Sequence, residues 1–107
     1  MTTLVAYRKM NPEVKAKLLP MLRSGDYRQA TGTFHYHDAD GDRYCVLGMI
    51  CLAAGLPPNN DDGCGQWTDV REILNTDNGG TEKLLYSMND EAKKTFSELA
   101  DWIEANL

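Results

Sequence analysis

The sequence predicts an α+β protein: a mostly helical, small single domain over residues 1–107, with a short β-hairpin packed on a central buried apolar helix. The first observation is that residues 44–56 hold no charged side chain and lie between polar, turn-rich segments. This run is longer than a usual strand and too short to span a membrane. A helix over Cys45–Gly55 would be apolar on every face, so we expect it in the core. Gly55 and the two prolines after it should end that helix.

The second observation is the pattern that precedes this run. Alternating polar and apolar residues over Gln29–His37 predict a strand. Asp38–Asp42 then predicts a hairpin turn, with Asp40 and Gly41 as the tight pair. A short return strand at Arg43 and Tyr44 would lead directly into the central helix.

The third observation is a set of amphipathic segments that would cover the central helix. Asn11 and Pro12 predict the start of one helix, which Ser24–Asp26 should end. Pro20 lies inside this segment and should kink it. A loop is expected over residues 59–66.

Three helices are expected in the C-terminal half. The first begins at Trp67–Asp69 with Thr68 as its N-cap, and a helix of one to two turns opens at Thr81. Asn89-Asp90 should break or recap that second helix. The sequence Thr95-x-x-Glu98 is a capping box that predicts the start of the last helix.

The charge is unevenly distributed along the chain. The net charge is −5, yet residues 1–36 carry six Lys/Arg and only two Asp/Glu, whereas the remainder carries five and fourteen. An acidic protein is repelled by phosphate at long range, which argues against binding a nucleic acid polymer. A compact anionic ligand held by the basic N-terminal third remains open. Three cysteines without CxxC spacing indicate reduced thiols, and no signal peptide or membrane segment is expected, which predicts a cytoplasmic protein.

Two cysteine and histidine patterns suggest chemistry. Cys45 lies where a hairpin enters a helix N-terminus, a position that lowers a thiol pKa, and His35 or His37 could supply a base for a cysteine hydrolase. His35-x-His37 with Cys45 or Cys64 could bind zinc, although the cysteine pair of a zinc site is missing. Structural roles for these residues are the alternative, and we expect no cofactor and no metal.

A further pattern imitates a known metal loop. Asp38-x-Asp40-x-Asp42 resembles the start of a calcium-binding loop. That loop needs glycine at its sixth position and glutamate at its twelfth, where this chain has Arg43 and Met49. A turn is the better interpretation.

A basic and aromatic set lies on the helix end and hairpin before the central helix. Arginine forks match phosphate geometry, and tyrosine rings stack on bases or sugars, so this set predicts a binding site for a small phosphorylated ligand. The alternative is that these arginines only solvate a surface. The predicted ligand-binding residues are Arg23, Tyr27, Arg28, Gln29, Thr33, Tyr36, Arg43 and Tyr44.

Several motifs together resemble a family of small proteins that tailed bacteriophages encode. They are Leu22-Arg23-Ser24-Gly25-x-Tyr27-x-Gln29, Tyr44-Cys45-x-Leu47-Gly48-x-x-Cys51, Met88-Asn89-Asp90 and Phe96-Ser97-Glu98-Leu99-Ala100-Asp101-Trp102-Ile103-Glu104. The chain departs from the family pattern at Val46 and at Glu91-Ala92. The resemblance implies a phage origin and the cytoplasm of an infected bacterium; it implies no particular activity.

Small phage proteins without enzymatic motifs commonly act by binding, and two routes fit. The first is a non-enzymatic counter-defence protein that sequesters a cyclic nucleotide immune signal. The second is a protein-binding inhibitor of a host or defence protein. The Arg/Tyr set favours the first, and a Cys45-dependent hydrolase is the remaining alternative, so the question of enzymatic activity stays open. A pocket large enough for a nucleotide suggests a homo-oligomer, with Trp67, Trp102 and Tyr86 as interface candidates.

Overall fold

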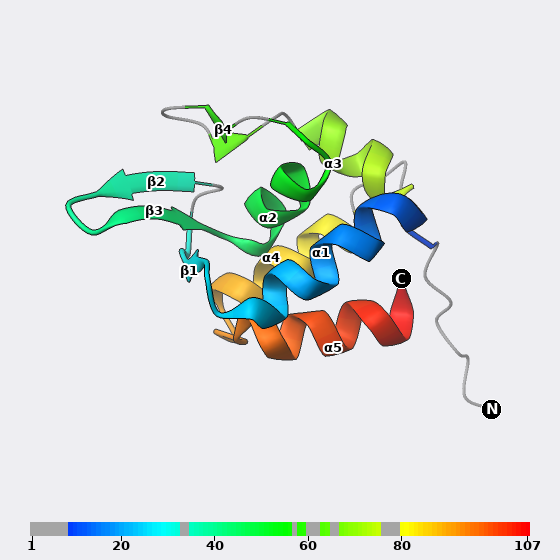
Figure 1. Cartoon of the computed structure of the whole chain (residues 1–107). Helices are drawn as coiled ribbons and strands as arrows, with labels where there is room; N and C mark the ends of the chain where they lie inside the picture. Colours follow the sequence, from blue (N-terminus) through cyan, green and yellow to red (C-terminus); the bar gives the residue numbers. More distant parts are fainter. Residues whose placement is uncertain (1–8, 33–34, 57, 60–62, 65–66, 76–79) are drawn as a thin grey trace.

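A computed structural model of the chain confirms the α+β class (Figure 1). It describes residues 9–32, 35–56, 58–59, 63–64, 67–75 and 80–107, with the side chains at positions 36, 58–59, 63–64 and 67–69 left aside. None of the helices described there is long and apolar enough to cross a membrane. The elements in chain order are α1 (Pro12–Ser24), β1 (Arg28–Gln29), β2 (His35–Asp38), β3 (Gly41–Tyr44), α2 (Val46–Ala53), β4 (Pro58–Asn59), β5 (Gly63–Cys64), α3 (Trp67–Leu74), α4 (Gly80–Asp90) and α5 (Phe96–Asn106).

Helix α2 is the buried centre of the fold, as its lack of charge predicts. Leu47, Met49 and Ile50 are fully buried, and α1, α3 and α4 pack around them (Figure 1). The helix is shorter than the predicted span. Cys45 is its N-cap, and Gly55 follows its end with a φ of 82°, in the left-handed region that a glycine adopts without strain.

Helices α1 and α5 lie side by side across one face of the core (Figure 1). The Asn11 side chain accepts hydrogen bonds from the backbone N–H groups of Glu13 and Val14, which confirms the predicted cap of α1. The capping box of Thr95 and Glu98 is also present at the start of α5. Both caps fix helix starts, and α1 packs against α5 as well as against α2.

The predicted strand over Gln29–His37 is wrong, because this segment contributes two separate strands. Gln29 belongs to β1 and His37 to β2, and Gly32 between them has a φ of 78°, which a continuous strand does not allow. The sheet order is β1-β3-β2, with β2 antiparallel and β1 parallel to β3. Arg28 therefore pairs in register with Arg43.

The hairpin turn is shifted by one residue from the predicted position. Ala39 and Asp40 form the two-residue connection, and Gly41 already pairs with Asp38 across the strands. Gly41 has a φ of 116°, so the glycine is needed at the first position of β3 rather than within the loop. The β2–β3 hairpin projects away from the helices (Figure 1).

The C-terminal half contains two further departures from the prediction. The expected loop over residues 59–66 includes the short strands β4 and β5, which pair antiparallel. Helix α3 starts at Trp67, one residue before its predicted N-cap. Helix α4 ends at Asp90, where the sequence predicts a break, and the Asn89 side chain bonds to Gln29 and to the Val46 N–H on other elements.

Candidate functional site

Two predicted arginines converge on one carboxylate at the outer side of the sheet. The Arg28 Nη1 donates to Asp38 Oδ1 at 3.3 Å, and the Arg43 Nε donates to Asp38 Oδ2 at 2.9 Å. We call Arg28, Arg43 and Asp38 the Arg–Asp cluster. Their side chains are 34%, 30% and 33% exposed, respectively. The parallel pairing of β1 with β3 brings these arginines together. The cluster therefore holds an anion between two guanidinium groups that remain accessible to solvent.

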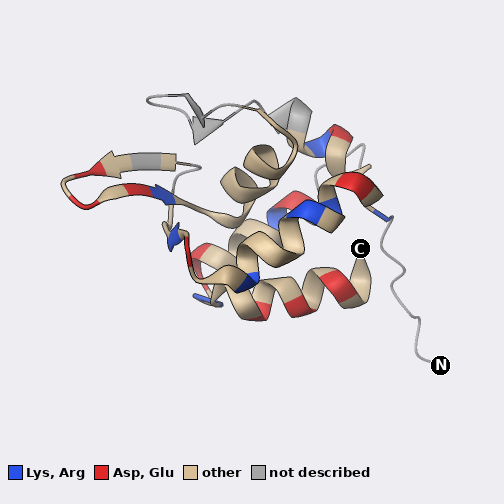
Figure 2. Ribbon diagram, viewed as in Figure 1, with Lys and Arg blue, Asp and Glu red and all other residues tan. Residues whose placement is uncertain are grey.

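The hairpin turn adds a second carboxylate beside the cluster. Asp40 Oδ2 lies 3.7 Å from Arg28 Nη2, and the Asp40 backbone N–H donates to Asp38 Oδ1 at 2.9 Å. Two positive and two negative side chains thus meet at the hairpin. Figure 2 shows these charges at the hairpin end of the molecule, away from the acidic edge of α5.

The neighbouring residues in the hairpin strands form a different cluster. His35 Nε2 and His37 Nδ1 lie 2.9 Å and 3.0 Å from Asp42 Oδ1, and these hydrogen bonds, the one from His35 first, lower the pKa of the Asp42 carboxyl. Tyr44 is buried, and its ring stacks on His35 with the centroids 4.9 Å apart. Tyr27 meets Tyr44 edge-on. Tyr44 therefore has a packing role, through its ring contacts with His35 and Tyr27.

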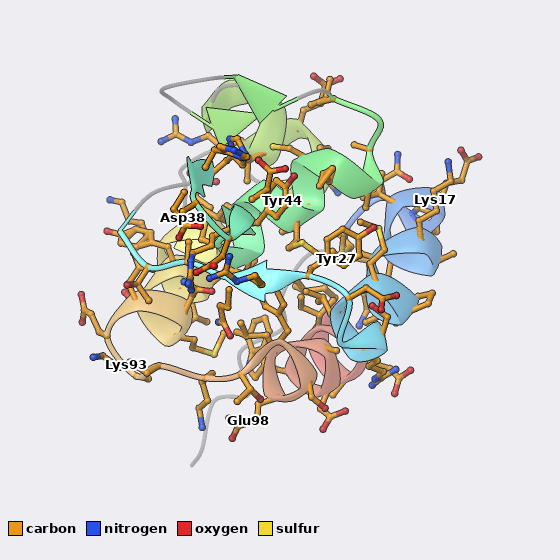
Figure 3. The ribbon with its side chains drawn as sticks, turned by 60° about the vertical axis from the view of Figure 1, so that its left-hand side comes forward. Lys17, Tyr27, Asp38, Tyr44, Lys93 and Glu98 are labelled. Atoms are coloured by element: carbon orange, nitrogen blue, oxygen red, sulfur yellow. The ribbon has the colours of Figure 1, made fainter. Side chains whose placement is uncertain are left out.

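Among the remaining aromatic members of the predicted set, the described Tyr27 does not lie at the Arg–Asp cluster. Tyr27 is half-buried and lies apart from Asp38, as Figure 3 shows. Thr33 lies outside the described residues, as does the side chain of Tyr36, whose backbone pairs with Arg43. The described residues thus define an anion position without a defined stacking partner for a base.

Arg23 belongs to a separate ion-pair group. Its guanidinium donates to Asp101 at 2.9 Å and to both carboxylate oxygens of Glu104 at 3.2 Å, joining the end of α1 to α5. The Glu104 and Asp101 carboxylates raise the pKa of Arg23 above its ordinary value. The structure therefore does not bring Arg23 to the other two predicted arginines.

Gln29 has a structural contact that the sequence analysis did not anticipate. Its Nε2 donates to Asn89 Oδ1 at 2.8 Å and to the Lys94 backbone oxygen at 2.7 Å. Asn89 is fully buried; its Oδ1 also accepts from the Val46 N–H at the start of α2, and its Nδ2 donates to the Ala30 oxygen. Asn89 thereby ties α4 to β1 and α2. The local sequence carries no signal for this role, because Asn89 is followed by the charged residues Asp90 and Glu91.

The candidate catalytic and metal chemistry finds no support in the described residues. Cys45 is 3% exposed at the N-terminus of α2, so a substrate cannot reach its thiol without movement of the core. Within the described ranges, no group of three or more His, Cys, Asp or Glu side chains could hold a metal ion.

A shallow groove lies elsewhere on the molecule, between the ends of α4 and α5. Its volume is about 420 Å³, and it is partly open to solvent. It is lined by Met88, Lys94, Glu98, Leu99, Asp101, Trp102, Ala105 and Asn106. Its mixed apolar and charged lining gathers no arginine, so we place the candidate anion site at the Arg–Asp cluster and not here.

Comparison with known proteins adds one match. A family model described as a domain of unknown function (DUF8296) matches residues 10–55. This span runs from the start of α1 to the end of α2 and includes the Arg–Asp cluster. No curated protein and no solved structure matches the chain.

The charge contacts predict a loss of stability in acid. The Thr95 backbone N–H lowers the pKa of Glu98 and the Arg23 guanidinium lowers that of Glu104, both from 4.5, while Asp42 is lowered from 3.8. Carboxylates with a lower pKa in the folded state stabilise it above the unfolded value and lose that contribution as the pH falls through the folded value. We expect the free energy of unfolding to fall as the pH drops below about 4.5, measured by denaturant titration. E104Q should show a shallower decline, and an equally steep decline would contradict this assignment.

Proposed function

We propose that the protein is a non-enzymatic binding protein that takes a small phosphorylated ligand, such as a cyclic nucleotide, at the guanidinium groups of Arg28 and Arg43. The observation that carries the proposal is the convergence of both groups on the single carboxylate of Asp38. A carboxylate and a phosphate group both accept hydrogen bonds from the N–H groups of a guanidinium group, with similar geometry. Asp38 thus marks a position where an anionic group fits between the two arginines.

The energetic balance favours exchange of this carboxylate for a phosphate. Ion pairs between side chains that are about one-third exposed contribute about 0–1 kcal/mol each. A hydrogen bond to a charged group contributes about 1.5–3 kcal/mol, and a phosphate offers more oxygens and more charge than a carboxylate. Replacing Asp38 therefore costs about as much as its two ion pairs contribute, and a nucleotide can exceed this cost through its phosphate contacts together with those of its base, sugar or second phosphate.

The proposed biological role is sequestration of an immune signalling nucleotide in a phage-infected bacterium. The resemblance to small phage proteins and the excess of basic residues in the N-terminal third, which holds Arg28, support this role. An exposed two-arginine position encloses little of a nucleotide, so a second copy of the chain is proposed to complete the pocket. Sedimentation with and without the ligand measures the stoichiometry of the complex.

We expect R28A and R43A each to weaken ligand binding by about ten- to a hundredfold, because each removes a charge-assisted contact to phosphate. The ligand is first found by thermal shift against a panel of signalling nucleotides, since a ligand at a thousand times its Kd stabilises by about 4 kcal/mol. Calorimetry then compares the variants. R23A is the matched control: it removes an exposed arginine of the separate α1–α5 group and should leave the affinity unchanged.

A protein partner is the second candidate, and the projection of the β2–β3 hairpin beyond the helices favours it (Figure 1). This candidate predicts that no nucleotide in the panel raises the melting temperature and that hairpin variants lose a stoichiometric partner from host lysate. Equal loss of nucleotide affinity in R23A and R28A would also count against the proposed site.

A further inference from the structure

We propose that the Asp38 carboxylate is a competitor of the phosphorylated ligand for the guanidinium groups of Arg28 and Arg43. A ligand binds only if its contacts contribute more free energy than the contacts of Asp38 that it displaces. This inference rests on the proposed function of Arg28 and Arg43. It concerns the selectivity of that same site.

The Asp38 carboxylate occupies one donor position on each of the two arginines. Its two oxygens accept from different arginines, at 3.3 Å from Arg28 Nη1 and at 2.9 Å from Arg43 Nε. A ligand oxygen cannot occupy either of these donor positions while the carboxylate remains. For a ligand that uses these two donors, binding and departure of the Asp38 carboxylate are therefore one exchange.

This exchange requires a movement of the Asp38 side chain and no movement of its backbone. Asp38 is the last residue of β2, and its backbone pairs with Gly41 across the hairpin. The side chain is one-third exposed, so a rotated carboxylate can reach water without leaving a buried charge. The pairing of β2 with β3 does not depend on the ion pairs, and the hairpin can stay in place.

The exchange with Asp38 favours larger phosphorylated ligands over small anions. The carboxylates of Asp38 and Asp40 both lie beside Arg28, and they repel any arriving anion. A small anion with few other contacts gains only the two guanidinium groups and must displace one carboxylate in return. A nucleotide adds contacts from its base, sugar or second phosphate. The competitor therefore discriminates against abundant inorganic phosphate in favour of a larger phosphorylated ligand.

The test uses inorganic phosphate as the probe on the full chain. D38N keeps the size of the side chain and an oxygen that can accept from the Asp40 N–H, while it removes the competing charge. We expect D38N to bind phosphate at least about tenfold more tightly than the unchanged protein, by calorimetry and by shifts of the arginine side-chain N–H signals. D40N is the matched control, since it removes the same charge from the same turn. Among the described residues Asp40 pairs with Arg28 at 3.7 Å, a longer contact than either one of Asp38, so D40N should raise the affinity by less than about twofold.

D38S provides a second variant if D38N proves unstable, because serine also accepts hydrogen bonds in turns. Phosphate affinity that is unchanged or lower in the folded Asp38 variants would overturn the inference, and so would an equal gain in D40N. The two proposals can fail separately. Tight phosphate binding by D38N with no nucleotide bound by the unchanged protein would refute the proposed function alone. Nucleotide binding through Arg28 and Arg43 without a gain in D38N would refute the competitor alone.

Discussion

Replacing Leu47 by aspartate is expected to abolish cooperative folding. Leu47 is fully buried in α2, where α1, α3 and α4 surround the helix. The substitution removes an apolar side chain, at about 2–5 kcal/mol, and buries an unpaired carboxyl group, at several kcal/mol more. The sum is comparable to the whole stability of a domain, about 5–15 kcal/mol. Ile50→Asp should have the same effect.

Leu52→Asp is the matched control for this prediction. Leu52 lies on the same helix but is half-buried, so its aspartate can reach water. Far-UV circular dichroism with thermal melting measures all three variants. A cooperative melt of L47D close to that of the unchanged protein would refute the placement of α2 at the centre of the core.

Replacing Asn89 by alanine is expected to destabilise the protein by about 2–4 kcal/mol. The side chain is fully buried. It makes hydrogen bonds with Gln29 in β1, with Ala30 directly after β1, and with Val46, the first residue of α2. Truncation leaves the buried groups at Ala30 and Val46 without these partners, and an unsatisfied buried group costs more than the net value of the bond. Denaturant unfolding measures the loss.

Two variants separate this network from a general effect of asparagine removal. Asn106→Ala removes one hydrogen bond, from Nδ2 to the Trp102 oxygen near the end of α5, and should cost less than about 1 kcal/mol. Asn89→Asp keeps the acceptor for Val46 but loses the donor to Ala30, so it should remain clearly destabilised. Equal effects of N89A and N106A would contradict the network.

The elements that the sequence predicts well are those with a strong local cause. The absence of charge around Leu47 is sufficient to predict a buried helix, and the capping box of Thr95 and Glu98 predicts the start of α5. Both signals lie within a few neighbouring residues. The structure contains both elements, although α2 is shorter than predicted.

The elements that the sequence does not predict depend on contacts between distant residues. β1 is only two residues long and exists because Arg28 and Gln29 pair with β3, across the intervening segment. The side chain of Asn89, near the end of α4, likewise has hydrogen-bond partners in β1 and at the start of α2. Local propensity cannot reveal such partners.

The candidate site follows the same rule. The sequence identifies Arg28 and Arg43 as candidates, but the register that joins them on Asp38 is a property of the sheet. The same limitation explains Arg23, whose carboxylate partners lie on α5, far along the chain. The sequence therefore predicts the residue types of the candidate site, and the pairing of the strands determines which of these residues meet.

The most direct test of the central claim follows the arginine side-chain N–H signals by NMR while the nucleotide that gives the largest thermal shift is added. We expect the Nε–H signals of Arg28 and Arg43 to move together and to saturate at the calorimetric stoichiometry, while that of Arg23 stays in place. Saturating binding that leaves the Arg28 and Arg43 signals unmoved would contradict the assignment of this site.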